Sequence, residues 1–150
     1  MATYTPLKQA EWEWVARNLE GAKLLVATFA TEHADRPITL EALDRTWDAW
    51  LATSPSKPDV IDRVINFIGC QFGQFLVDQA GFEWTIVTDE FGTDLGVRAL
   101  PNRGDVLVCP ISFVAKRWEP RTTSFLATSF RAIVGQVGTI QSDWDRPEKS

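Results

Sequence analysis

Side chains that commonly carry out chemistry are sparse in this chain. Its 150 residues include one histidine, His33, which stands in a polar segment beside Glu32 and Asp35. A metal site needs several ligands at organised spacing. A catalytic triad needs a base that a third group holds in place. We therefore interpret His33 as a solvated loop residue rather than as a ligand or a catalytic base, and we expect no metal and no cofactor.

The two cysteines also point away from catalysis. Cys70 lies in a helical pattern between Gly69 and Phe72, and Cys109 ends a short apolar run. A reactive thiol needs a depressed pKa and access to solvent, whereas thiols in apolar surroundings behave as small hydrophobes. We predict free thiols that serve packing, which is typical of a cytoplasmic protein.

Three carboxylates, Asp89, Glu90 and Asp94, surround Gly92. Their spacing does not match a calcium loop, which places about five oxygen ligands across twelve residues. Nothing in the sequence indicates the burial that would raise one pKa for glycosidase-like acid and base roles. A solvated turn is the favoured interpretation, with cation binding as the alternative. The usual glycine-rich phosphate motifs do not occur.

Charge is distributed unevenly along the chain. The formal net charge of −5 argues against a nucleic-acid or anionic-membrane partner, because such partners are bound through Lys and Arg. Residues 78–94 contain five acids and no base, whereas residues 98–131 contain six bases and two acids. This basic half could engage an acidic partner or an anionic ligand, or it could pair with the chain's own acidic hairpin. The candidate binding residues are Trp84, Arg98, Lys116, Arg117 and Trp118.

These side chains must be positioned by a long central helix. Residues 58–80 are apolar on nearly all sides, begin with Pro58 and are followed by Gly81, which predicts a buried helix. Gly69 and Gly73 each cost about 1 kcal/mol of helix propensity relative to alanine. Either a ligand approaches the backbone there or another element packs closely, and we favour packing.

Alternating residues after this helix predict a three-stranded antiparallel sheet over residues 83–88, 94–100 and 105–109. The third strand is a continuous apolar run, which favours burial on both faces. The sequence therefore predicts an α+β fold, with the sheet packed on the long helix.

Helices are expected to surround this core. Residues 7–30 and the segment from Thr39 to the prolines at 55–58 predict a helical hairpin. Trp12 falls in the apolar stripe of the first helix. Trp14 lies beside that stripe, where it either packs or is exposed on a binding face, and packing is favoured.

The C-terminal part is predicted less sharply. Residues 111–118 form a short helix or an extended turn. A last helix begins at Thr122 or Thr123 and ends at Gly138, and residues 142–150 form a frayed polar tail.

We predict that residues 1–150 form one domain, with a helical hairpin over 1–55, the core over 56–140 and a tail over 141–150. The N-terminus lacks the features of a secretory signal, and no apolar stretch is long enough to span a bilayer. These features favour a cytoplasmic protein, without a membrane partner, that is a monomer or a homodimer.

Several short motifs resemble those of a family of small bacterial domains, domain-of-unknown-function family 3806. The resemblance covers roughly residues 58–137, and its motifs are packing and turn residues. They are Ile65-Asn66-Phe67-Ile68-Gly69 with Phe72-Gly73, Gly81-Phe82-Glu83-Trp84, Asp89-Glu90-Phe91-Gly92, Pro110, and Lys116-Arg117-Trp118-Glu119. The resemblance implies an α+β bacterial protein with the order helix, hairpin, strand and helix, and it implies no activity.

Two functional hypotheses follow. The lack of a catalytic set and the seven tryptophans, a residue type favoured at interfaces, favour a non-enzymatic module of the immunity or accessory type that binds a protein partner. The alternative is a small-molecule-binding protein or an enzyme, with a pocket near Gly69, Gly73, Trp84 and the Lys116-Arg117 pair.

Overall fold

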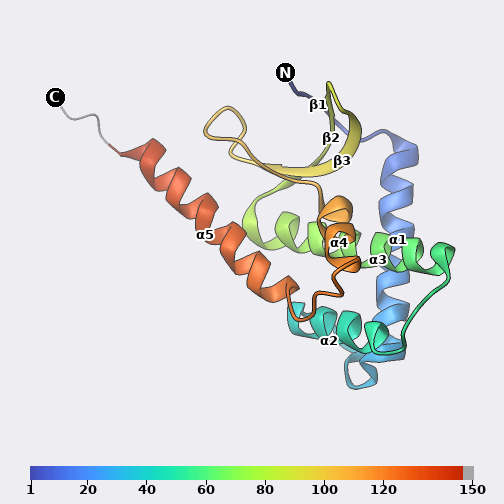
Figure 1. Cartoon of the computed structure of the whole chain (residues 1–150). Helices are drawn as coiled ribbons and strands as arrows, with labels where there is room; N and C mark the ends of the chain where they lie inside the picture. Colours follow the sequence, from blue (N-terminus) through green and yellow to red (C-terminus); the bar gives the residue numbers. More distant parts are fainter. Residues whose placement is uncertain (147–150) are drawn as a thin grey trace.

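The computed structural model describes residues 1–146. Within them, helices surround a four-stranded antiparallel sheet whose strand order is β1-β2-β3-β4 (Figure 1). The elements in chain order are β1 (Thr3–Thr5), α1 (Gln9–Phe29), the short 3-10 turn η1 (Thr31–His33), α2 (Leu40–Leu51), α3 (Pro58–Ala80), β2 (Glu83–Asp89), β3 (Gly92–Ala99), β4 (Val106–Val108), α4 (Pro110–Trp118) and α5 (Leu126–Asp145). The predicted α+β class is confirmed.

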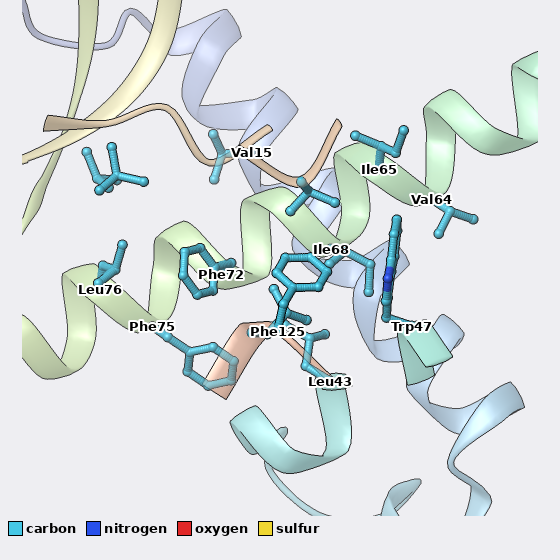
Figure 2. Packing of buried hydrophobic residues seen from close by; sticks show 14 of the residues in the cluster. Val15, Leu43, Trp47, Val64, Ile65, Ile68, Phe72, Phe75, Leu76 and Phe125 are labelled. Atoms are coloured by element: carbon cyan, nitrogen blue, oxygen red, sulfur yellow. The ribbon is translucent and has the colours of Figure 1, made fainter. Parts of the chain in front are cut away.

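Helix α3 is the centre of the fold, as its composition predicts. It crosses beneath the sheet and has α1, α2, α4 and α5 around it (Figure 1). Ile68 and Phe72 are fully buried in its middle, and Figure 2 shows them among side chains from the other helices. The helix ends at Gly81, which has the left-handed conformation (φ 74°) and donates its N–H to the carbonyl of Leu76.

The sheet has one strand more than expected. Strand β1 pairs antiparallel with β2, placing Tyr4 opposite Val87, and Thr85 Oγ1 donates to the carbonyl of Thr5 at 3.1 Å. Three residues are too few to give a periodic signal, so sequence patterns miss this strand. The prediction that the last strand is buried on both faces is wrong, because Leu107 is only half-buried between its two buried neighbours.

Helix α1 buries most of the apolar stripe that its sequence predicts, shifted by part of a turn. Its buried stripe includes Val15, Ala22 and Val26 and is centred toward Asn18, whose Nδ2 donates to the carbonyl of Trp14 at 2.9 Å. Trp12 is left at the edge of this stripe and is 47% exposed, so its predicted core position is wrong. Trp14 is partly buried and packs against the core, as favoured.

The C-terminal part differs most from the prediction. Residues 110–118 are helical, so the predicted short helix is present and the alternative of an extended turn is not. Helix α5 begins at Leu126 rather than at Thr122 or Thr123, and it continues past Gly138 to Asp145. Gly138 does not take the positive φ that ends a helix. The expected end at 138 and the expected tail from 142 are therefore wrong up to Asp145, and residues 147–150 lie outside the described part.

One cluster of buried side chains joins α1, α2, α3, the sheet and the start of α5. Trp47 of α2 is fully buried beside Trp50 and Phe125, and its Nε1 donates to the carbonyl of Thr122 at 2.9 Å. None of the helices within residues 1–146 combines the length and the apolar character needed to cross a membrane.

Candidate functional site

Trp84, one of the predicted binding residues, has a packing role. It is 7% exposed, and its Nε1 donates to Gln74 Oε1 at 3.1 Å. Its ring lies so close to Gly73 that a Cβ atom at Gly73 would be 2.6 Å from Trp84 Cη2. Trp84 therefore fills the space between strand β2 and helix α3.

Arg98 contacts Asp105 of the β3–β4 loop and Tyr4 of β1. Its Nε donates to Asp105 Oδ1 at 2.9 Å, and its guanidinium carbon lies 3.8 Å from the centre of the Tyr4 ring. Hydrogen bonding from Arg98, aided by the backbone N–H of Asn102, lowers the pKa of Asp105. Arg98 and Trp84 share a cleft of about 280 Å³ with Tyr4. The partner of Arg98 is the β3–β4 loop and not the acidic hairpin.

Lys116, Arg117 and Trp118 point in different directions. The guanidinium of Arg117 lies 3.8 Å from the centre of the Phe113 ring, and its Nη1 donates to the Phe113 carbonyl at 3.0 Å. Trp118 packs on Trp50, with the ring centres 5.3 Å apart. Lys116 is exposed and makes no ion pair among residues 1–146.

Only Lys116 and Trp118 of this triplet line a common groove. It has a volume of about 650 Å³ and lies between the end of α4 and the start of α3. Its apolar surface includes Ile61 and Ile65, and Asp62 and Glu119 supply acidic groups next to Lys116. The three charges are of mixed sign, so the groove has no clear preference for an anionic ligand.

The pocket expected near Gly69 and Gly73 is filled by side chains. A Cβ atom at Gly69 would be 2.8 Å from the Ile111 Cα, and one at Gly73 would be 2.9 Å from Pro110 Cγ. These glycines therefore let α4 and Trp84 approach α3 closely, which is the favoured packing interpretation.

The two thiols and the one histidine lie in different parts of the fold. Burial raises the pKa of Cys70 to about 12 and that of Cys109 to about 11. His33 Nε2 lies 3.8 Å from Glu32 Oε1, which itself pairs with Arg45. Within residues 1–146, no group of three or more His, Cys, Asp or Glu side chains could hold a metal ion.

The acidic hairpin is only partly the solvated turn that the sequence indicates. Asp89 and Glu90 are exposed, and Asp89 Oδ1 accepts the backbone N–H of Phe91 at 2.8 Å. Asp94 is half-buried, and its Oδ2 accepts a hydrogen bond from Ser112 Oγ on α4 at 2.9 Å. Asp94 thus faces the interior side of the hairpin, which sequence spacing does not reveal.

The feature that sequence analysis missed is the second half of α5. After Leu126 and Ala127, no described residue of this helix is fully buried. The helix slants away from α3, and its last turns lie near the β3–β4 loop (Figure 1). Its apolar residues are nevertheless spaced by three and four positions, which places them on one side of the helix. We call this set the α5 stripe: Phe130, Ile133, Val137, Ile140 and Trp144.

The α5 stripe is only partly covered by the rest of the chain. Ile140 contacts Gly104 of the β3–β4 loop, and Arg103 of the same loop pairs with Asp145 at 2.6 Å. Trp144 remains 56% exposed, and Val134, next to the stripe, is 36% exposed. Such a row of incompletely covered apolar side chains is typical of a surface that contacts another protein.

The comparisons with known proteins support the fold. A family model described as "Domain of unknown function (DUF3806)" matches residues 40–128, more than half of the chain. The match includes α2, which the resemblance by motifs did not, and it ends in the first turn of α5. The search of curated proteins found no match.

A solved crystal structure from Bacteroides thetaiotaomicron has a similar fold. The TM-score is 0.60 at 13% identity, and the match covers 96% of this chain and 47% of that one. This chain therefore spans about half the length of that protein, and the likeness concerns the fold alone.

Proposed function

Because the chain belongs to the DUF3806 family, whose function is unknown, we propose a function from the chain's own geometry: it is a non-enzymatic, protein-binding module of the immunity or accessory type. The observation that carries this proposal is the α5 stripe. Beyond its first turn, α5 holds the apolar side chains of the stripe only partly buried against the core, and Trp144 is 56% exposed. A partner that covers the stripe would supply the missing burial.

The occupant that fits the stripe is an amphipathic helix of another protein. Apolar residues spaced by three and four positions are the pattern by which two helices pack along their length. The formal net charge of −5 of the whole chain favours a partner of opposite net charge, because opposite fields speed encounter. The immunity or accessory role follows this chemistry: a small acidic protein masks part of a basic partner.

The test compares two double substitutions on opposite sides of α5. Val137→Asp with Trp144→Asp puts charge into the stripe, and Thr128→Asp with Ser142→Asp puts the same charge on the far side of the helix. Each tagged protein is used to capture partners from lysate of its source organism. The captured protein is then purified, and its affinity is measured by calorimetry.

We expect the control to bind as the unchanged protein does and the stripe variant to bind at least about tenfold more weakly, since buried unpaired charge is costly at an interface. Equal binding by both variants would show that the interface is elsewhere. Concentration-dependent self-association that only the stripe variant abolishes would replace the partner helix with a second copy of this chain.

We also propose that residues 1–146 act as one domain in the cytoplasm. The single buried cluster that joins the N-terminal helices to the sheet supports the first point. The two free thiols, which oxidising compartments would tend to pair, support the second. One cooperative unfolding transition and recovery in the cytoplasmic fraction are the expected results.

A further inference from the structure

A second open groove lies away from the α5 stripe. It has a volume of about 550 Å³, which is in the range of small-molecule sites. The start of α1, the middle of α3, the β2–β3 hairpin and the start of α4 form its walls. Trp14, Ile86, Leu95 and Ile111 provide its apolar surface.

The ionisable groups of this groove are all acidic. Glu11 and Asp94 line it, and no Lys, Arg or His does. Neither carboxylate forms an ion pair with any residue of the described part, 1–146. Two helix N-termini, those of α1 and α4, lie nearby and together contribute about one positive charge. The groove therefore keeps a net negative field.

Hydrogen bonds hold both carboxylates in place and leave some of their acceptor positions free. Glu11 Oε1 accepts the backbone N–H of Lys8 at 2.7 Å. Asp94 Oδ1 accepts the N–H of Leu95 at 2.8 Å, and its Oδ2 accepts from Ser112 Oγ at 2.9 Å. A carboxylate offers about four lone-pair positions, so acceptor capacity remains for a ligand.

Two further side chains are suited to a ligand. The Asn66 side chain, on α3, lines the groove, and its amide can both donate and accept hydrogen bonds. The Trp14 ring lines it as well, and an indole face is the best aromatic partner for a cation. The field of Asp94 is also felt by Cys109, whose pKa is raised by burial first and by Asp94 next.

We propose that this groove binds an organic cation, an ammonium or guanidinium group carried on an apolar body. Glu11 and Asp94 bind the charged group, Trp14 lies against it, and Ile86 and Leu95 contact the apolar body. This site is independent of the protein-binding surface on α5. The cation could be a free amine or a Lys or Arg side chain of a peptide, since both present the same chemistry.

The test titrates the full chain with three matched probes: 2-phenylethylammonium, neutral 2-phenylethanol and anionic 3-phenylpropionate. Binding is followed by NMR through the indole Nε1–H signal of Trp14, assigned with Trp14→Phe. A second arm uses the peptides acetyl-Phe-Lys-amide and acetyl-Phe-norleucine-amide. Asp94→Asn and Glu11→Gln remove one charge each and preserve shape, and Asp35→Asn is the control at an exposed loop position.

We expect the ammonium probe to bind, and Asp94→Asn or Glu11→Gln to weaken it about tenfold, as a unit charge at contact distance would. Asp35→Asn should leave the affinity for the ammonium probe unchanged, and added salt should lower that affinity. If the lysine peptide binds more tightly than the free amine, the natural ligand is a peptide. If the free amine binds more tightly, the natural ligand is a free amine.

Equal binding of all three small probes would overturn the proposal. So would binding of the ammonium that neither Asp94→Asn nor Glu11→Gln weakens, or signal changes confined to residues outside the groove. Each variant is checked by its NMR spectrum, and because two independent substitutions are used, a folding defect in one leaves the other to decide.

Discussion

The side-chain carboxylate of Asp44, on α2, accepts a hydrogen bond from the backbone N–H of Leu126 at 2.7 Å, and its second oxygen accepts that of Ala127 at 2.9 Å. Phe125 precedes the helix and cannot cap it. One turn further along α2, Asp48 accepts the backbone N–H and the hydroxyl of Ser124. The projecting helix α5 is therefore fixed at its start by acids from another helix.

This relationship predicts the effect of Asp44→Ala. Two partly buried N–H groups at the start of α5 would lose their acceptor, so the free energy of unfolding should fall by about 1–2 kcal/mol. Urea unfolding measures the change, and Asp35→Ala, at an exposed loop position, should change stability by less than about 0.5 kcal/mol.

The same carboxyl predicts a pH dependence. Burial raises the pKa of Asp44 above its ordinary value of 3.8, more than the hydrogen bonds from Ala127 and Leu126 lower it. Between pH 3.8 and the raised pKa, the folded state binds more protons than the unfolded state. The contribution of Asp44 to stability is therefore largest below pH 3.8, and it decreases as pH rises through the raised pKa. The stability difference between the unchanged protein and Asp44→Ala should decrease over that range. A difference that grows with pH would contradict the raised pKa.

Two glycines in two helices should respond to alanine in opposite ways. At Gly73 the added Cβ would be 2.6 Å from Trp84 and 2.9 Å from Pro110, both buried. Overpacking should outweigh the gain in helix propensity, and Gly73→Ala should lower the free energy of unfolding by about 1–3 kcal/mol.

The matched substitution is Gly135→Ala in α5, where a Cβ would meet nothing within 4 Å. Only helix propensity changes, so stability should rise by about 0.5–1 kcal/mol. Thermal unfolding of both variants measures the contrast. A destabilised Gly135→Ala would mean that the outer side of α5 is covered in solution.

Particular residues show why part of the fold can be predicted from sequence. Pro58, Gly81 and the all-round apolar character of the segment between them define α3 without any tertiary information. Gly138 does not define the end of α5, because a glycine ends a helix only when its φ is positive, and the sequence does not give φ. Strand β1 depends on pairing with a segment more than 80 residues away.

The candidate sites are predicted from the sequence less well than helix α3 is. Trp84 and Arg117 have residue types and sequence neighbours that suit a binding site, but neither property tells which way a side chain points. The α5 stripe could have been found, since Ile140 and Trp144 continue the spacing of Ile133 and Val137. A glycine at 138 interrupts this pattern in the sequence but not in the helix.

The thiols should be nearly inert in the folded protein. With pKa values of about 12 and about 11, Cys70 and Cys109 hold about 10⁻⁴ and 10⁻³ of their population as thiolate at pH 8, against about a quarter for an ordinary thiol. Modification by Ellman's reagent should be at least about 100-fold slower than for glutathione, and both thiols should react at once in denaturant. Cys109→Ser assigns the remaining signal to Cys70. Fast reaction of Cys109 would show that its sulfur is open to solvent.

Arg117 and Lys116 are adjacent bases that should behave differently when truncated. Arg117 covers the ring of Phe113, whose other contacts include Phe72 at 5.2 Å between ring centres, and it also donates to the Phe113 carbonyl. Arg117→Ala should lower the free energy of unfolding by about 1–2 kcal/mol, and Arg117→Lys should lose part of this because an ammonium lacks the planar stacking face.

Lys116→Ala should change stability by less than about 0.5 kcal/mol, since Lys116 is exposed and unpaired within residues 1–146. Urea unfolding of the three variants measures this order, and equal effects of the two alanine substitutions would show that the stacking on Phe113 is absent in solution. If the order holds, a loss of partner binding by an Arg117 variant reflects a weakened fold. The interface must then be tested at Trp144, which is 56% exposed, and at Val137, with the unfolding free energy of each variant measured beside its binding because Val137 packs against the core.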